Sequence, residues 1–214
     1  MIESLGKKKE VHIMDIKKIV LTGGPCAGKS MAVKLIKETF SKKGVVVLFV
    51  PEAATELISG GVCPWTCGTN LDYQIVQCKL QRFKEQMFDE AVRTMKEDKF
   101  LIVCDRGMLD NKAYMSDEEF EKCLETLGTT EEEINASYDA VFHMVSTAKG
   151  LKEFYIFENN VARYETPEQA AALDDVLIKA WSKHPNHKII ENSLSVEDKM
   201  NRLMNEIGKF LGIE

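Results

Sequence analysis

The chain has 214 residues, enough for one α/β domain with a sizeable core, and 44% of them are hydrophobic. Its formal net charge of −6 at pH 7, with no basic block beyond residues 7–9, argues against a surface that binds nucleic acid. No run approaches the ~20 apolar residues of a membrane span and residues 1–10 resemble no secretory signal, so we expect a cytoplasmic protein without membrane insertion.

Short apolar runs alternate along the chain with segments of helical periodicity. After a flexible tail expected at residues 1–16, a single domain is predicted over residues 17–214. We predict strands at residues 18–22, 45–50, 100–105, 140–145 and 188–190, and helices at residues 31–42, 51–59, 71–98, 116–127, 167–183 and 196–211. Strands that alternate with helices predict an α/β fold, in which helices cover both faces of a parallel sheet.

The longest predicted helix, residues 71–98, carries its apolar residues along one stripe: Ile75, Leu80, Phe83, Met87, Ala91 and Met95. Two later helices begin with capping boxes, Ser116 with Glu119 and Thr166 with Gln169. Ligands of parallel sheets collect beyond the carboxyl ends of the strands. We therefore look for functional residues in the loops that follow the predicted strands.

The loop after the first strand has the pattern of a phosphate-binding loop. It reads Gly23, Gly24, Pro25, Cys26, Ala27, Gly28, Lys29 and Ser30, and Met31 follows in the predicted helix. The glycines let backbone N–H groups point into one concavity, and the helix N-terminus favours an anion. In such a loop Lys29 reaches the β- and γ-phosphates, and Ser30 is a ligand of Mg²⁺. A glycine-rich turn before an ordinary helix is the alternative, but the complete match favours a nucleoside triphosphate site.

Three charged residues after the second and third strands are candidates for chemistry next to the phosphates. Asp105 ends an apolar run, where a carboxylate that assists Mg²⁺ belongs, although it can also cap a helix. Arg106 can contact the transferred phosphoryl group, or form an ordinary salt bridge. Glu52 can act as general base for an acceptor hydroxyl, or only favour the start of the next helix.

Two further candidates come from the last third of the chain. Arg163 lies in a segment that can fold over the phosphates and offset charge there, with a solvated surface arginine as the alternative. Asn192 follows the last strand and can line a base pocket or help to cap the final helix. The sequence 110–112, Asp-Asn-Lys, is not followed by the Asp of a guanine motif, which mildly favours ATP, or a base that is recognised by the backbone after the fifth strand.

The order of these motifs resembles the AAA-like P-loop domain family of the TRPL translocation defect GTP-binding protein and its bacterial relatives. This family is related to the ribosylnicotinamide kinase domain of the bacterial NAD-biosynthesis regulator. The resemblance covers about residues 17–212. The motifs that carry it are residues 23–30, 51–55, 104–107, Asp110, 112–115, Asn160, Arg163, 165–168, Trp181, 184–185, Ile190 and Asn192.

The resemblance implies a five-stranded parallel sheet in the order 2-3-1-4-5, with residues 146–185 as a lid. Carried over by position, Gly28, Lys29 and Ser30 bind phosphate and Mg²⁺, Asp105 assists the metal, and Arg163 serves the lid. The photoreceptor member of the family continues into a domain associated with lipid binding, so its membrane roles are not expected here.

Two functions follow from these patterns. One is a kinase-like phosphotransferase that uses Mg²⁺ and ATP or GTP and acts on a nucleoside or similar hydroxylated metabolite. The other is a nucleotide-dependent switch that hydrolyses slowly and acts through partner proteins, which the sequence does not specify.

Overall fold

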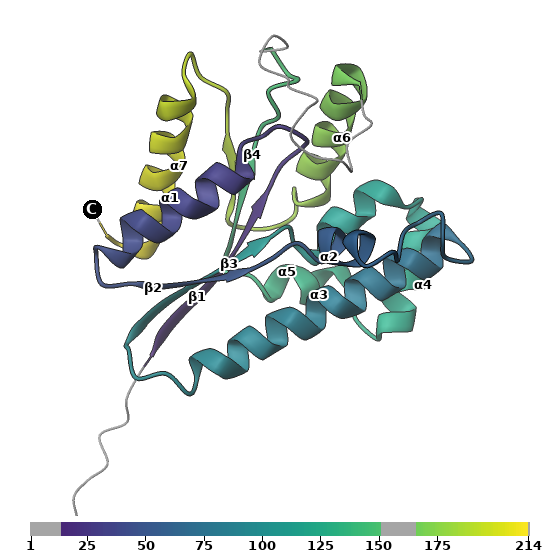
Figure 1. The fold of residues 1–214 in the computed structure, drawn as a ribbon, viewed down its shortest axis with the longest axis horizontal. Coiled ribbons are helices and arrows are strands. Elements are labelled where there is room, and N and C mark those ends of the chain that lie inside the picture. Colours follow the sequence, from purple (N-terminus) through teal and green to yellow (C-terminus); the bar gives the residue numbers. More distant parts are fainter. Residues whose placement is uncertain (1–13, 151–165, 214) are drawn as a thin grey trace, which may run out of the picture.

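The computed structural model describes residues 14–150 and 166–213. Its centre is a parallel sheet in which the five strands follow the order β2-β3-β1-β4-β5 (Figure 1), which confirms the predicted order. The strands are β1 (Asp15–Thr22), β2 (Val46–Val50), β3 (Lys99–Asp105), β4 (Ala140–Met144) and β5 (His187–Ile190). β1 begins at Asp15, three residues before the predicted strand, so Asp15 and Ile16, which were expected in the tail, pair with β3 instead.

The helices follow the predicted alternation, and none in the described part of the chain combines the length and apolar character needed to cross a bilayer. They are α1 (Lys29–Ser41), α2 (Ala53–Ser59), α3 (Asn70–Val92), the 3-10 helix η1 (Met108–Tyr114), α4 (Asp117–Leu127), α5 (Glu131–Ala136), α6 (Pro167–Ala180) and α7 (Val196–Leu211). Both predicted capping boxes are present, at α4 and α6. The sequence reasoning did not predict η1.

Helices cover both faces of the sheet, as predicted. Ile36 and Phe40 of α1 and Leu203 of α7 pack on one face, against a core that includes Leu21 and Phe142. On the other face, residues of α3, α4 and η1 and the buried Trp181 pack around a second core. Figure 1 shows α1 and α7 together on one side of the sheet and α3 and α4 on the other.

The predicted stripe of the longest helix is correct only in part: Ile75 packs against the second core, but some other members of the stripe do not. α3 ends at Val92 rather than near residue 98, and Phe83 and Met87 are 57% and 37% exposed. The buried face of α3 carries polar residues instead: Tyr73, Gln74, Gln81 and Glu85 together with Cys78. Hydrogen bonds explain why polar residues can be buried here, because Glu85 accepts from the side-chain amide of Gln81 and from the hydroxyl of Tyr138.

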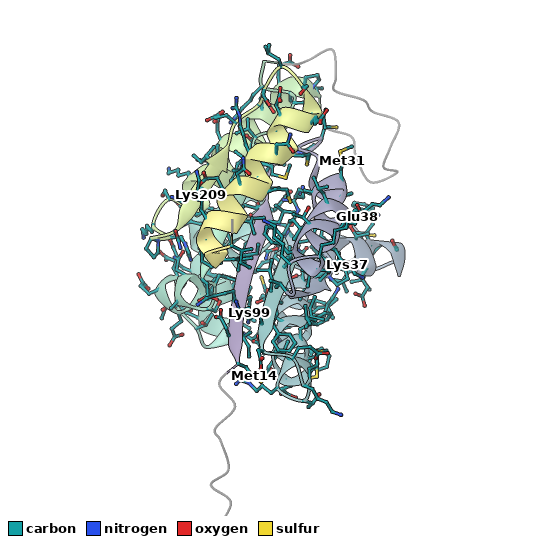
Figure 2. The ribbon with its side chains drawn as sticks, turned by 90° about the vertical axis from the view of Figure 1, so that its left-hand side faces the viewer. Met14, Met31, Lys37, Glu38, Lys99 and Lys209 are labelled. Atoms are coloured by element: carbon teal, nitrogen blue, oxygen red, sulfur yellow. The ribbon has the colours of Figure 1, made fainter. Side chains whose placement is uncertain are left out.

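The strand register brings the candidate loops together at the carboxyl ends of the strands. Leu21 lies opposite Asp105 of β3, and Thr22 lies opposite His143 of β4. The loop that follows Thr22 therefore begins between the ends of two neighbouring strands. Met31, just beyond this loop, lies in the upper half of Figure 2, whereas Met14, which precedes β1, lies in the lower half.

Candidate functional site

The glycine-rich loop after β1 adopts a backbone that its sequence permits. Gly23 and Gly28 have φ angles of 143° and 93°, which residues other than glycine rarely adopt. A Cβ on Gly23 would also lie 2.1 Å from the carbonyl oxygen of Met144. Cys26 has φ of 57°, an uncommon value for a residue with a side chain. The chain is thus wound tightly between the end of β1 and the start of α1.

Lys29 folds back over this loop. Its Nζ donates to the carbonyl oxygen of Gly23 at 3.0 Å. Burial and then the charge of Arg106 lower the pKa of Lys29 to about 8, although the carboxylates of Asp105 and Glu52 act in the opposite direction. The ammonium is therefore crowded by another cation, and an anion bound in the loop would stabilise it. Ser30 is exposed, and so is the side chain of Met31 at 56%.

Glu52 and Arg106 form an ion pair beside Lys29. The Nε of Arg106 donates to Oε1 of Glu52 at 2.5 Å, and Oε2 accepts from the hydroxyl of Thr55. Burial alone raises the pKa of Glu52, but Arg106, Lys29 and the hydrogen bonds outweigh it and lower this pKa to about 2. Glu52 is thus a charged hydrogen-bond acceptor at neutral pH rather than a strong base.

Two buried polar atoms at this ion pair have no hydrogen-bond partner among the described residues. One is Nη1 of Arg106 itself, and the other is Oδ1 of the preceding residue, Asp105. Burial raises the pKa of Asp105 although the charge of Lys29 lowers it. Arg106 itself has φ of 65°. A carboxylate oxygen and a guanidinium nitrogen without partners, beside a phosphate loop, suit a magnesium-bound polyphosphate.

The buried face of α3 adds two polar groups that the sequence reasoning missed. The hydroxyl of Tyr73 and Oε1 of Gln74 are buried without a hydrogen-bond partner among the described residues. Burial raises the pKa of Tyr73 to about 12, and the charge of Glu52 contributes to this rise. The hydroxyl of Tyr73 lies near Glu52, so it adds a hydrogen-bonding group on that side of the loop.

A buried carboxylate, also missed, holds the start of the loop. Asp174 of α6 is 0% exposed, and its Oδ1 accepts from the backbone N–H of Gly24 at 2.7 Å. Ser146 N–H, His143 Nε2 and Lys149 Nζ contact the same carboxylate. Burial alone would raise the pKa of Asp174, but these contacts lower it to about 2. A charged residue on the otherwise apolar stripe of α6 was the signal.

Asn192 lies behind the loop, in a structural network. Its Nδ2 donates to the carbonyl oxygens of Ser146 and Lys149, at 2.9 and 2.8 Å. Its Oδ1 accepts from Nζ of Lys199 at 3.0 Å. Its side-chain polar atoms are thus engaged in tying the segment after β5 to the segment after β4.

Asp110 of η1 joins the loop edge to the helical layer. It is 2% exposed, and its Oδ1 accepts from the hydroxyl of Thr22 at 2.6 Å and from Nε1 of Trp181 at 2.9 Å. Its Oδ2 accepts from the backbone N–H of Gly107. This carboxylate fixes the turn that presents Arg106, which precedes Gly107 in the chain.

Arg163 lies outside the described residues, as does the part of the expected lid at residues 151–165. No group of His, Cys, Asp and Glu side chains that could by itself hold a metal ion occurs in residues 14–150 or 166–213. A magnesium site at Ser30 and Asp105 would therefore need the phosphates of the nucleotide as further ligands.

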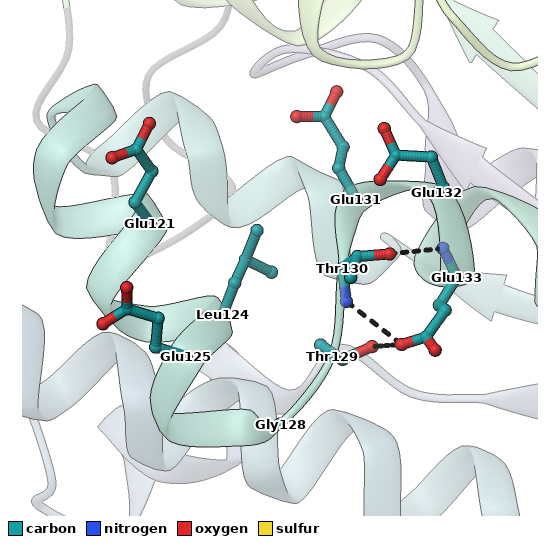
Figure 3. A pocket seen from close by; sticks show the side chains of 9 residues that line it. All are labelled: Glu121, Leu124, Glu125, Gly128, Thr129, Thr130, Glu131, Glu132 and Glu133. Atoms are coloured by element: carbon teal, nitrogen blue, oxygen red, sulfur yellow. Dashed lines mark hydrogen bonds between the residues drawn. The ribbon is translucent and has the colours of Figure 1, made fainter.

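A separate pocket of about 570 Å³ lies between α4 and α5 (Figure 3). It is lined by Glu121, Leu124, Glu125, Gly128, Thr129, Thr130, Glu131, Glu132 and Glu133. The hydroxyl of Thr129 donates to Glu133, whose backbone N–H donates to Thr130 within the capping box. The ionisable side chains that line this pocket are all carboxylates, so the pocket would repel a triphosphate.

Comparison with known proteins agrees with the fold. The profile of an AAA domain family matches residues 18–199. Comparison with curated protein sequences gives no significant match. Among solved structures, the chain is similar to the thymidylate kinase from Ehrlichia chaffeensis, with a TM-score of 0.58 and 16% identity, covering 92% of this chain and 99% of that one. This similarity shows a P-loop fold of the kinase type, whereas the narrower resemblance noted from the motifs stays a prediction.

Proposed function

Because the chain belongs to the AAA domain family of P-loop NTPases, we propose that it transfers the γ-phosphoryl group of ATP or GTP to a small acceptor. The acceptor would be a nucleoside or a similar hydroxylated metabolite. One observation carries this proposal: three buried polar atoms without partners among the described residues, on Tyr73, Asp105 and Arg106, lie close to the charges of Glu52 and Lys29. Buried polar groups without partners are costly, so a bound ligand is a reason to retain them.

Each residue has a role in the transfer that follows from its place. Lys29 would neutralise charge on the β- and γ-phosphates, and the unpartnered Nη1 of Arg106 could contact the phosphoryl group as charge shifts during transfer. Ser30 and Asp105 would hold Mg²⁺, which when bound would neutralise charge on the phosphates. Oδ1 of Asp105 has no other partner among the described residues, which fits this assignment.

Glu52 would face the acceptor. The acceptor oxygen forms a bond to the γ-phosphorus while the bond from that phosphorus to the β,γ-bridging oxygen breaks, and the nucleoside diphosphate leaves. Glu52 is ionised, so it would accept a hydrogen bond from the attacking hydroxyl and orient it, and it would take up the hydroxyl proton as the new bond to phosphorus forms. The hydroxyl of Tyr73 and the amide of Gln74 would bind the polar groups of the rest of the acceptor.

Calorimetry with Mg²⁺ and ATP or GTP, followed by a phosphotransfer screen over nucleosides, tests the proposal. We expect binding that Lys29→Ala abolishes and diphosphate formation that needs an acceptor. Glu52→Gln should leave the Kd of the triphosphate within about threefold and lower the transfer rate about 100-fold, in the range of a lost catalytic proton acceptor. Glu56→Gln, on the exposed side of α2, is the matched control and should transfer normally.

Other outcomes would contradict parts of this account. Equal transfer by Glu52→Gln and wild type would remove Glu52 from the mechanism. Diphosphate formation at the same rate with and without acceptors would favour the nucleotide-dependent switch. Absence of binding of either triphosphate would refute the nucleotide site itself.

A further inference from the structure

Lys199 places a buried ammonium group directly behind the phosphate loop. Its side chain starts in the first turn of α7, and the residue is only 4% exposed. Its Nζ donates to the carbonyl oxygen of Ala27 in the loop at 3.0 Å, to that of Val145 at 2.5 Å and to Oδ1 of Asn192 at 3.0 Å. The lysine thus joins the loop to the segments that follow β4 and β5.

All three acceptors are uncharged oxygens. An ammonium has three N–H donors and no acceptor, so these bonds use its full capacity. A neutral amine would point its lone pair at one of the oxygens. Among the described residues no carboxylate forms an ion pair with Nζ of Lys199. The contacts therefore select the charged form but leave it without a counter-ion, which is costly for a buried group.

The bond to Ala27 also orients the loop. In a trans peptide the C=O of one residue and the N–H of the next point in opposite directions. A carbonyl of Ala27 that is held toward α7 therefore turns the N–H of Gly28 the other way. Amides of this part of the loop are the ones expected to bind phosphate.

We infer that Lys199 is a positioning residue of the nucleotide site, whose buried charge is neutralised through the loop by the bound polyphosphate. This inference rests on the proposed function, because it needs a phosphate in the loop. Lys199 would act through the peptide between Ala27 and Gly28 rather than touch the nucleotide.

The surrounding charges make the inference testable by proton linkage. Burial lowers the pKa of Lys199 to about 8, the charges of Asp174 and Glu191 raise it, and that of Lys29 lowers it. A polyphosphate bound in the loop would raise the pKa of Lys199. Binding at pH 8 should then take up about half a proton at this lysine.

The experiment is titration calorimetry of Mg²⁺–ATP and Mg²⁺–GTP at pH 7, 8 and 9, in buffers of different ionisation enthalpy. We compare wild type with Lys199→Met, with Lys199→Gln, and with Lys209→Met as control. Lys209 lies on the same helix with its side chain 72% exposed, and Figure 2 labels it. Each Lys199 variant should raise Kd at least tenfold and should take up about half a proton less than wild type at pH 8. Lys209→Met should match wild type.

A purely structural role could weaken binding but would leave proton uptake unchanged, so unchanged uptake overturns the inference. If wild type binds a triphosphate and the Lys199 variants bind it with a Kd within twofold of the wild-type value, the inference is also overturned, while the proposed function stands. If wild type binds neither triphosphate, both fail together. Thermal unfolding checks that each variant folds, and if Lys199→Met does not fold, the values for Lys199→Gln decide in the same terms.

Discussion

Replacement of Asp174 by Asn tests whether one buried carboxylate holds the phosphate loop in place. The carboxylate accepts from Gly24 N–H at 2.7 Å and Ser146 N–H at 3.2 Å, and it contacts His143 Nε2 at 3.0 Å and Lys149 Nζ at 2.9 Å. Asparagine keeps one carbonyl oxygen for the two backbone donors. Its amide group, however, cannot accept from Lys149, and the negative charge is lost.

The expected cost can be worked out from the pKa of Asp174. This pKa falls from 3.8 to about 2 on folding, which corresponds to about 2 kcal/mol of stability for the charged form. Breaking a buried charged pair by removing one partner costs about 3–5 kcal/mol. We therefore expect Asp174→Asn to lower the free energy of unfolding at pH 7 by about 2–4 kcal/mol.

Urea denaturation of wild type, Asp174→Asn and Asp175→Asn provides the assay. Asp175 also pairs with Lys149, but its side chain is 74% exposed, so its replacement should cost at most about 1 kcal/mol. The pKa of Asp174 is lower in the folded state than in the unfolded one. Its contribution is therefore complete above about pH 4 and is lost as the pH falls toward 2.

The difference in unfolding free energy between wild type and Asp174→Asn should narrow over the same pH range. The reasoning is refuted if Asp174→Asn and Asp175→Asn lose the same stability at pH 7, or if the difference does not change between pH 5 and pH 2.

Two more substitutions test the packing around the turn that presents Arg106. Gly107→Ala should lower the free energy of unfolding in urea by about 1–3 kcal/mol, because the new Cβ would lie 2.7 Å from Trp181 and 2.8 Å from Val20. A variant as stable as wild type would show that this contact relaxes freely. Trp181→Phe should lower the free energy of unfolding by at least about 1–3 kcal/mol, because the ring is fully buried and Asp110 loses the hydrogen bond from the indole N–H. A loss below about 0.5 kcal/mol in thermal or urea unfolding would contradict the importance of this buried hydrogen bond.

The sequence is informative where a signal lies in one short stretch. Each strand contains a short apolar run, the capping boxes span four residues, and the phosphate loop is a single contiguous motif, so each could be predicted locally. α3 shows the limit of this reasoning. Its exposed Phe83 and its buried Glu85 reverse the expected pattern, because Glu85 is paired with Tyr138, which is 53 residues away in the chain. Periodicity of apolar residues contains no information about such partners.

The phosphate loop is also held by contacts between residues that are far apart in the chain. Asp174 binds an N–H at the start of the loop, and Lys199 binds a carbonyl near its end, so a buried anion and a buried cation hold opposite peptide dipoles. Both side chains come from helices more than 140 residues further along the chain. Each is a charged residue on an apolar stripe, which is visible in the sequence, but its partner is not. Amides that are already oriented need no reorganisation when an anion binds, so these two side chains lower the cost of binding without touching the ligand.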